Sequence, residues 1–306
     1  MKNKRVLITG TSTGHGFLAS KMMAEKGYTV FSCMRDPEGK NINAANELLE
    51  LSKSVKGNIH VIDMDVTNDD EVINGVKKAT EIAGGIDVVI NNAGFAGIGW
   101  QEEFTVDQFH QVMDVFLYAA QRLYRAVLPQ MRERKSGLFI NNTTIGARMA
   151  VPLRQGPYSC AKWALEVLSE RYQQELGDLF NIDSVALQPS PTSGTQLVQN
   201  AFMANDEKIR AGYPPFEDDR YYKVWKDIAT QFVSEKKFDD LSNVSQTMID
   251  LIEMPVGERP VRIAVPGRCI IGFEEVQEMN ELFGKSQDAI EAKWIEGKSE
   301  NFWAEQ

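Results

Sequence analysis

The sequence predicts an α/β fold in which a doubly wound parallel sheet carries helices on both of its faces. Short apolar, β-branched runs alternate along the chain with stretches of helical period, and this alternation is typical of βαβ units. Short connections and right-handed crossovers then lead to a doubly wound sheet. The predicted strands are Val6–Ile8, Tyr28–Cys33, Ile59–Met64, Ile86–Ile90, Leu138–Ile140, Ile182–Leu187 and Val261–Val265.

Composition indicates one globular domain over residues 1–306. The chain is 43% hydrophobic and 25% charged, which allows a sizeable core, and no linker divides it. The net charge of −10 argues against a general nucleic-acid binder. The apolar run that ends at Gly10 is too short for a membrane anchor, and no membrane association is expected. Cys33, Cys160 and Cys269 have no paired spacing, so we expect a reducing cytoplasm and no metal site.

The remaining elements follow in order. A helix is expected over Phe109–Arg134, and a second over 158–177 with its apolar stripe at residues 161, 164, 165, 168, 172 and 176. From about 189 to 240 the pattern loosens into an aromatic and charged segment, which is either a substrate lid or an irregular insertion. A helix at Leu241–Glu253 follows. The tail after Phe273 is expected to form an amphipathic helix that packs on the same domain.

A glycine-rich turn follows the first strand and opens a helix. The turn is Thr9-Gly-Thr-Ser-Thr-Gly-His-Gly16, and amide donors at such a helix start bind a pyrophosphate. The position of the turn predicts a dinucleotide site formed by Gly10, Thr11, Ser12, Thr13, Gly14, His15 and Gly16. His15 between two glycines is interpreted as packing beside the turn, with contact to the cofactor or a response to pH as alternatives.

The end of the second strand favours NADP over NAD. Met34 lies where an acidic residue usually binds a free ribose hydroxyl, and Arg35 follows it. An arginine can bind a phosphate through two hydrogen bonds. Asp36 could instead bind the ribose or pair with Arg35, and Arg35 itself could form only a surface ion pair.

The ends of the third and fourth strands supply further candidates for the cofactor site. Asp65, followed by Val66, could accept a hydrogen bond from an adenine amino group, or it could cap the next helix together with Thr67. The small residues of Asn91-Asn92-Ala93-Gly94 allow backbone to lie against a ribose and a nicotinamide. All of these positions are expected at one edge of the sheet.

Tyr158 and Lys162 are the candidates for proton transfer. They are four residues apart in a predicted helix, so their side chains share one face. A free tyrosine has a pKa near ~10, and a nearby cation lowers it. A phenol tuned in this way exchanges a proton with an alcohol or a carbonyl.

Together these motifs resemble the short-chain dehydrogenase/reductase family, whose members have a Rossmann-like fold. The resemblance covers residues 4–195 well and rests on Thr9–Gly16, Asp65, 91–94, Thr143-Thr144, Tyr158 with Lys162, and the proline turn at Pro189. It implies that Tyr158 is the proton donor or acceptor, and that Lys162 lowers its pKa and holds the nicotinamide ribose. It also implies that Thr144 orients the substrate oxygen in place of the usual serine, and that Pro189 and Thr192 contact the cofactor.

One position departs from the family pattern. Where the family has a catalytic asparagine that helps to bind a relay water, this chain has Phe116. Phenylalanine cannot take that role. Either Phe116 packs in the core and the proton takes another route, or turnover is slowed, altered or lost.

The resulting prediction is an NADP(H)-dependent oxidoreductase that acts on an alcohol or ketone of an apolar or ring-bearing molecule. Two alternatives stay open: a cofactor-binding sensor or scaffold with little turnover, and a lyase or epimerase that uses bound cofactor. The resemblance implies a homodimer or homotetramer through the helices near 105–134 and 158–177. The expected pocket residues are Phe95, Trp100, Met149, Tyr213 and Trp225.

Overall fold

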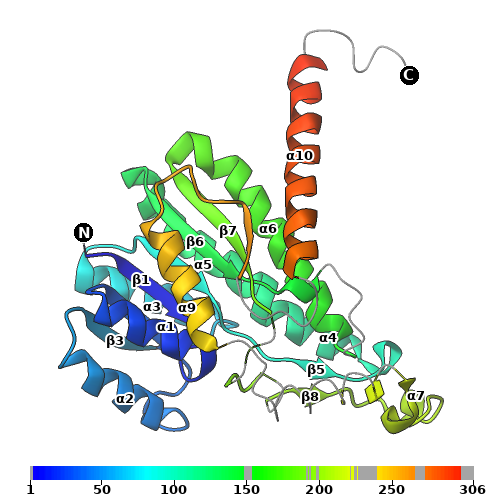
Figure 1. Cartoon of the computed structure of the whole chain (residues 1–306). Coiled ribbons are helices and arrows are strands. Elements are labelled where there is room, and N and C mark those ends of the chain that lie inside the picture. The colour runs from blue at the N-terminus through cyan, green and yellow to red at the C-terminus, as the bar shows by residue number, and fades with distance from the viewer. Residues whose placement is uncertain are drawn as a thin grey trace.

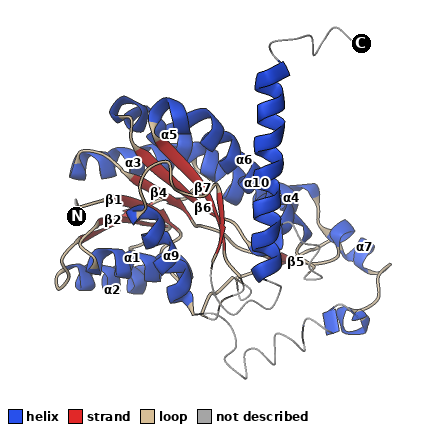
Figure 2. Ribbon diagram, turned by 45° about the horizontal axis from the view of Figure 1, so that its top comes forward, coloured by secondary structure: helices blue, strands red, loops and turns tan. Residues whose placement is uncertain are grey.

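Seven parallel strands form the central sheet, and helices cover both of its faces (Figures 1 and 2). In this computed structural model the strand order is β3-β2-β1-β4-β6-β7-β9, which confirms the predicted doubly wound topology. The strands are β1 (Arg5–Thr9), β2 (Thr29–Met34), β3 (Asn58–Asp63), β4 (Val88–Asn91), β6 (Gly137–Asn142), β7 (Ile182–Gln188) and β9 (Arg262–Ala264). The structure describes residues 3–147, 154–190, 192, 194–197, 200–220, 222–223, 226, 240–265 and 273–297.

Two apolar layers hold the helices to the sheet. Alternate strand residues point to opposite faces, so Val6 and Ile8 of β1 enter one layer and Leu7 enters the other. The first layer is completed by α1 (Gly14–Glu25), α2 (Ile42–Ser52) and α9 (Leu241–Glu253). The second is completed by α3 (Asp69–Ala83), α5 (Ala119–Arg134) and α6 (Gly156–Phe180).

All seven predicted strands form, with ends that differ by at most two residues from those expected, and α9 has the predicted bounds. The prediction lacked two short strands, β5 (Gly97–Ile98) and β8 (Phe202–Met203), which pair in parallel as a second small sheet. Two residues are too few to show an alternating pattern. This pairing places the segment expected as a lid beside the loop that follows β4. That segment also contains α7 (Glu207–Arg210) and the short helix η4 (Phe216–Asp218).

The helix expected over Phe109–Arg134 is interrupted, which corrects the prediction of one continuous helix. It starts as α4 (Val106–Met113), where Thr105 caps the N-terminus, and continues after the interruption as α5. Between them the π-helical turn η2 (Asp114–Tyr118) widens the helix by i→i+5 hydrogen bonding. The wider turn changes the direction in which residues near 116 point.

The predicted tail helix forms as α10 (Phe273–Gly297), and its first turns pack on the domain. Val276 and Asn280 are buried, whereas Leu282 and Phe283 are exposed. Figure 1 shows the rest of α10 standing out from the body, so the expectation that the tail packs on the domain was only partly right. Neither α10 nor any other helix in the described part of the chain is long and apolar enough to cross a membrane.

Candidate functional site

The glycine-rich turn lies at the switch point of the sheet, between the carboxyl ends of β1 and β4. Gly10 has a φ of +68°, and a Cβ there would lie 2.6 Å from the Cα of Ala93. A Cβ on Gly16 would lie 2.5 Å from the Gly10 carbonyl oxygen and 2.6 Å from Nδ2 of Asn92. Contacts of that length exclude a side chain at either position. The turn therefore packs directly against the backbone of the Asn91–Gly94 segment.

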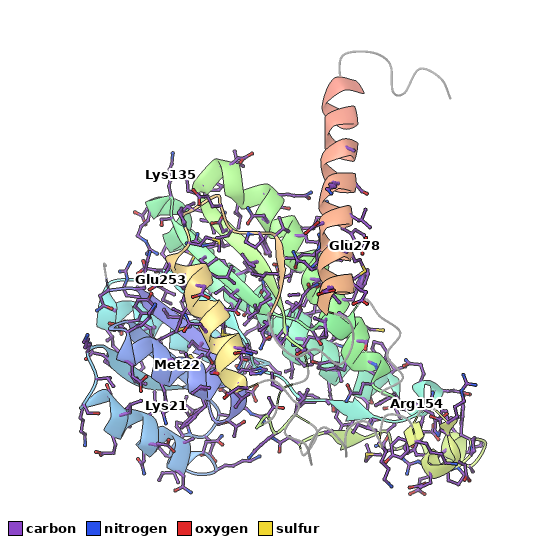
Figure 3. The ribbon with its side chains drawn as sticks, in the orientation of Figure 1. Lys21, Met22, Lys135, Arg154, Glu253 and Glu278 are labelled. Carbon is purple, nitrogen blue, oxygen red and sulfur yellow. The ribbon has the colours of Figure 1, made fainter. Side chains whose placement is uncertain are left out.

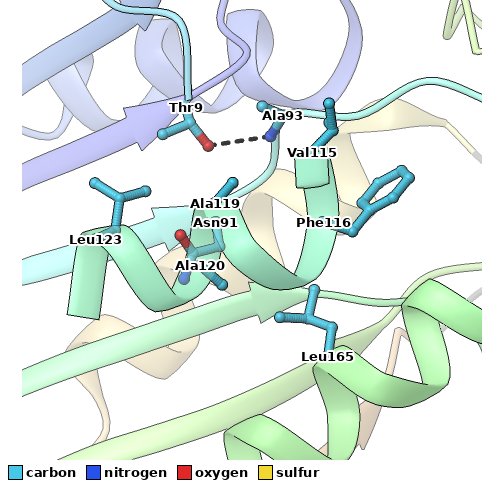
Figure 4. A pocket seen from close by; sticks show the side chains of 9 residues that line it. All are labelled: Thr9, Asn91, Ala93, Val115, Phe116, Ala119, Ala120, Leu123 and Leu165. Atoms are coloured by element: carbon cyan, nitrogen blue, oxygen red, sulfur yellow. Dashed lines mark hydrogen bonds between the residues drawn. The ribbon is translucent and has the colours of Figure 1, made fainter. Parts of the chain in front are cut away.

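Hydrogen bonds from Asn92 fix this packing. Its Nδ2 donates to the carbonyl oxygens of Thr9 (2.9 Å) and Gly10 (3.2 Å). Its Oδ1 accepts a hydrogen bond from Nδ2 of Asn142, at 2.8 Å. In return, Thr9 Oγ1 accepts hydrogen bonds from the backbone N–H groups of Asn92 and Ala93, the second of which is drawn in Figure 4. Three strand ends, of β1, β4 and β6, are thus held together at the site.

The start of α1 has the properties of a site for a phosphate group. Thr13 is the N-cap residue, but its side chain accepts no capping hydrogen bond, and the first turn contains no acidic residue. The N–H groups of a first helical turn have no partner within the helix, and they carry a partial positive charge. A dinucleotide therefore fits the residues present: its diphosphate meets these donors, and the glycines let it approach the backbone.

His15 joins the turn to the loop after β7. Its Nε2 lies 2.7 Å from Oγ1 of Thr192, which is 177 residues further along the chain. Burial, and then the charge of Lys162, lower the pKa of His15 to about 4, so its ring is neutral at pH 7. His15 and Thr192 were both predicted cofactor residues, and the structure brings them together.

Arg35, at the end of β2, lies close to Asp65 at the end of β3. Its Nη1 is 3.6 Å from Oδ2 of Asp65, and 68% of the Arg35 side chain is exposed. Asp36 is committed elsewhere, because its carboxylate accepts a hydrogen bond from the N–H of Lys40 at 2.7 Å. Arg35 thus forms the surface ion pair that was one alternative, with Asp65 in place of Asp36. Its exposure still leaves the guanidinium accessible to a ligand.

Asp65 does not cap α3, which corrects one of its two predicted roles. Its Oδ1 accepts hydrogen bonds from the N–H and the hydroxyl of Thr67, at 2.9 and 2.7 Å. Burial acts to raise the pKa of Asp65, but these hydrogen bonds and the charge of Arg35 outweigh it and leave the pKa lowered. Asn68 is the cap, because its side chain accepts from the N–H groups of Asp70 and Glu71. Val66 follows Asp65 and is buried.

Tyr158, Thr144 and Lys162 lie together where β6 ends and α6 begins. Thr144 lies near enough to the Tyr158 hydroxyl to act on its pKa, and the Thr144 Oγ1 donates to the Pro189 carbonyl oxygen at 3.4 Å. Lys162 is 4% exposed, and its Nζ donates to the Asn142 carbonyl oxygen at 2.5 Å. Nζ is 5.6 Å from the centre of the Tyr158 ring. Asn142 was not among the predicted site residues, although two asparagines at the end of a predicted strand are a recognisable signal.

Burial, not charge, dominates the protonation of this pair. It lowers the pKa of Lys162 to about 7 and raises that of Tyr158, against which the Thr144 side chain acts. The sequence predicted a lowered pKa for Tyr158, and that prediction was wrong, because burial raises this pKa. The pattern showed the neighbouring cation but not the burial, which disfavours both charged forms.

Phe116 occupies the place beside Lys162 where the family pattern has an asparagine. Its ring is 3% exposed, and the Lys162 Nζ lies 4.2 Å from the ring centre. A small internal space beside it, with room for about one water molecule, borders the π-helical turn and β4. Figure 4 shows its lining: Thr9, Asn91, Ala93, Val115, Phe116, Ala119, Ala120, Leu123 and Leu165.

An aromatic wall adjoins Tyr158. Phe116 packs edge-on against Tyr158 at 5.4 Å between ring centres, and Phe95 lies 6.4 Å from Phe116. Phe202 of β8 completes the group by an edge contact with Phe95 at 5.6 Å. Phe202 lies in the segment expected as a lid and was not among the predicted pocket residues. It reaches this cluster because β8 pairs with β5.

Two other predicted pocket residues belong to a separate aromatic cluster. Trp100 stacks on Tyr213 and Phe216, with ring centres 4.8 and 5.5 Å apart. The Arg154 guanidinium lies 3.9 Å from the centre of the Trp100 ring and pairs with Asp219. Figure 3 labels Arg154 at the end of the molecule where α7 lies. This cluster fastens the lid segment to the start of α6.

Met149 and Trp225, the remaining predicted pocket residues, lie outside the described residues. Within the described residues, no group of three or more His, Cys, Asp or Glu side chains could hold a metal ion.

Comparison with known proteins agrees with this geometry. The family model for short chain dehydrogenase matches residues 4–206. A 3-ketodihydrosphingosine reductase from Bacteroides thetaiotaomicron is 33% identical over 189 residues, which are 62% of this chain and 64% of that protein. The chain thus spans less than two thirds of that relative. The uncharacterized oxidoreductase YusZ of Bacillus subtilis is 28% identical over 254 residues, which are 82% of this chain and 84% of that one.

Solved structures show the same fold. A short-chain dehydrogenase from Streptomyces avermitilis superposes with a TM-score of 0.71 at 22% identity, over 97% of each chain. An actinorhodin polyketide ketoreductase with NADPH superposes with a TM-score of 0.70 at 23% identity, over 89% of this chain and 97% of that one.

Proposed function

The chain belongs to the short-chain dehydrogenase family, and we propose that it is an NADP(H)-dependent oxidoreductase. The reaction interconverts an alcohol and a ketone on an apolar or ring-bearing small molecule. The observation that carries this proposal is the grouping of Thr144, Tyr158 and Lys162 at the sheet edge that also holds the glycine-rich turn.

The side chains handle the proton. In the reducing direction the Tyr158 hydroxyl donates its proton to the carbonyl oxygen of the substrate, and in the oxidising direction it takes that proton back. A raised pKa keeps Tyr158 protonated at neutral pH, as a donor must be. The Thr144 hydroxyl, which lies beside that of Tyr158, orients the same substrate oxygen. When Lys162 is protonated, its charge favours the phenolate that forms after the transfer.

The cofactor, when bound, supplies or accepts the hydride. The turn from Gly10 to Gly16 and the start of α1 would hold its diphosphate. The backbone from Asn92 to Gly94, together with Pro189 and Thr192, would contact its nicotinamide half. Asp65 and Val66 would contact its adenine.

Arg35 supports NADP over NAD. It is an exposed cation at the end of β2, and Met34 before it is buried and apolar. A 2′-phosphate offers a guanidinium two strong hydrogen bonds. The Arg35 guanidinium also lies 3.6 Å from the Asp65 carboxylate. A bound 2′-phosphate would therefore either contact Arg35 together with Asp65 or take the place of Asp65 as its partner.

The aromatic wall supports an apolar substrate. Phe95, Phe116 and Phe202 belong to one apolar cluster with Tyr158, next to the hydroxyl that exchanges the proton. Such a surface binds rings and hydrocarbon chains by burial and edge contacts.

The test is a screen of the purified protein with NADPH and NADH against a panel of ketones and aldehydes. We expect NADPH-dependent reduction of apolar substrates, with kcat lowered by about 10²–10⁴-fold in Tyr158→Phe, the range for loss of a general acid. A clear preference for NADH would contradict the role given to Arg35.

Phe116 favours a second candidate, a cofactor-binding sensor with little turnover. The ring stands beside Lys162 and cannot hold a relay water. Tight NADPH binding, together with no turnover that depends on Tyr158 across a broad panel, would support the sensor and reject the enzyme.

We also propose a homodimer or homotetramer. Large apolar side chains are exposed along the helices that the family pattern suggests for contact: Tyr118, Trp163 and Val167, at 39%, 37% and 40%. Sedimentation velocity of the wild type and of Val167→Glu tests this assembly, because a buried charge at an interface would dissociate it.

A further inference from the structure

We propose that Phe116 is a positioning residue that holds the Lys162 ammonium beside Tyr158 by a cation–π contact. The proposal rests on the proposed function, in which Lys162 belongs to the proton-transfer pair. It assigns a use to the residue that stands where the family pattern has an asparagine.

The contact between the two side chains is close and buried. Nζ of Lys162 lies 4.2 Å from the centre of the Phe116 ring, and the two residues are 4% and 3% exposed. A cation within about 6 Å of an aromatic ring centre is attracted by the ring, and more strongly when water is excluded. Nζ also donates to the carbonyl oxygen of Asn142 at 2.5 Å. Lys162 forms no ion pair within the described residues, so the ring and this carbonyl are its main partners.

The ring is held in place from several sides. It packs edge-on against Tyr158 at 5.4 Å, and it belongs to the π-helical turn Asp114–Tyr118. On a third side it fills the space left by Gly94, where a Cβ would lie 2.3 Å from Cε1 of Phe116. A ring fixed in this way limits where Nζ can lie, and therefore sets its distance from the Tyr158 ring.

Few titratable groups face Lys162. Tyr158 faces it from the same helix, and His15 of α1 acts on it electrostatically; His15 is itself neutral at pH 7. From β6 it meets the Asn142 carbonyl, and from the π-helical turn only the Phe116 ring. Burial disfavours the ammonium and brings the pKa of Lys162 to about 7. The ring stabilises only the charged form of Lys162. A substitution that removes the ring would therefore lower the pKa of Lys162, and the ammonium would lose its proton at lower pH.

The first experiment compares Phe116→Leu with Phe116→Tyr in the pH profile of kcat/KM for carbonyl reduction at saturating NADPH. Leucine keeps the apolar bulk without a ring face, and tyrosine keeps the face. We expect the alkaline limb of the profile to move down by about one pH unit in Phe116→Leu and to stay in place in Phe116→Tyr. An unchanged limb in Phe116→Leu, or an equal shift in both variants, would overturn the proposal.

A second experiment does not depend on turnover. Urea unfolding between pH 6 and 10.5 gives the loss of stability caused by Phe116→Leu, both in the wild type and in a Lys162→Met background. We expect that loss to grow as the pH falls in the wild type, because only the ammonium uses the ring, and to be independent of pH in Lys162→Met. A loss that is independent of pH in both backgrounds would overturn the proposal even if Phe116→Leu folds poorly.

The two experiments separate the proposal from the function on which it rests. If the wild type shows no NADPH turnover that depends on Tyr158, the proposed function fails, and the unfolding experiment still reports on Phe116 and Lys162. If turnover is present and neither experiment links Phe116 to the charge of Lys162, only the positioning role fails.

Discussion

The glycine turn and the proton-transfer pair lie at the same edge of the sheet, but they are built from different groups. The turn consists of backbone: Gly10 and Gly16 have no room for a Cβ, and the start of α1 keeps its N–H groups free of capping side chains. The pair consists of side chains, because it is formed by the partly buried phenol of Tyr158 and the buried amine of Lys162.

Because of this difference, the turn and the pair should respond differently to substitution. In the turn an added methyl group meets backbone atoms that cannot move away, so geometry is lost together with binding. In the pair a side chain of similar shape can replace either residue without a steric clash. Each such substitution changes burial and charge, and it therefore changes the pKa values. Substitutions should therefore affect stability and binding in the turn, and pH dependence in the pair.

The largest expected effect tests the pair through Lys162→Met. The pKa of Lys162 is about 7 in the folded protein, and its ordinary value of 10.5 applies to the unfolded chain. Between these two pH values the unfolded state therefore binds more protons than the folded state. The free energy of unfolding of the wild type should rise with pH across this window. Relative to Lys162→Met, which cannot titrate, the rise should total about 4 kcal/mol. Urea unfolding from pH 6 to 10.5 measures it.

Below pH 7 Lys162 is charged in both states, so the difference between the two proteins should become constant. Methionine also removes the hydrogen bond to Asn142, but that loss adds an offset that does not itself vary with pH and cannot produce the slope. A difference that does not vary between pH 7 and 10.5 would show that burial does not control this lysine.

The next largest effect tests the turn through Gly10→Ala. The left-handed backbone costs an alanine roughly 1–2 kcal/mol, and the 2.6 Å approach to the Ala93 Cα adds a similar amount, so we expect a loss of about 3 kcal/mol and weaker NADPH binding. Gly257→Ala is the matched control, because φ is +82° there and no atom lies within 4 Å of its Cβ. It should cost about 1 kcal/mol. Equal losses at both positions would mean that backbone conformation, and not packing against Ala93, restricts the turn.

Local sequence patterns were enough to predict most of the fold and the site residues that local structure brings together. Strands and helices appear in the predicted order, since alternation and helical period are local properties. The spacing of Tyr158 and Lys162 sufficed to place them on one helix face. Because parallel strands end at a common edge, the turn at Gly10 and the segment at Ala93 could also be expected together.

The rest depends on contacts between distant parts of the chain. The hydrogen bond of His15 to Thr192 and the contact of Phe116 with Lys162 join segments that no local pattern relates. The π-helical turn has the same apolar spacing as an α-helix to within one residue, so its sequence gives no separate signal. The pKa of Tyr158 depends on burial, which exists only after folding.

A smaller effect tests whether a side chain adds to cofactor binding at a site that is formed mainly by backbone. Arg35→Ala removes the exposed guanidinium at the end of β2, and we expect KM for NADPH to rise about 10-fold or more while KM for NADH stays unchanged, since one charge-assisted hydrogen bond contributes about 1.5–3 kcal/mol. Lys53→Ala, which removes a comparably exposed cation from an ion pair with Glu50, is the control. A parallel loss for both cofactors would indicate that Arg35 acts only through Asp65.

The smallest expected effect compares the starts of two helices at the same edge. In α3 the Asn68 side chain accepts hydrogen bonds from two N–H groups, and three acidic residues follow, whereas in α1 the Thr13 side chain accepts none. Asn68→Ala should therefore lower the free energy of unfolding by about 1 kcal/mol, and Thr13→Ala should leave it nearly unchanged without cofactor. Urea unfolding with and without NADPH measures both. If Thr13→Ala is as destabilising as Asn68→Ala in the absence of cofactor, the N–H groups of α1 are already satisfied by the protein and are not kept for a phosphate.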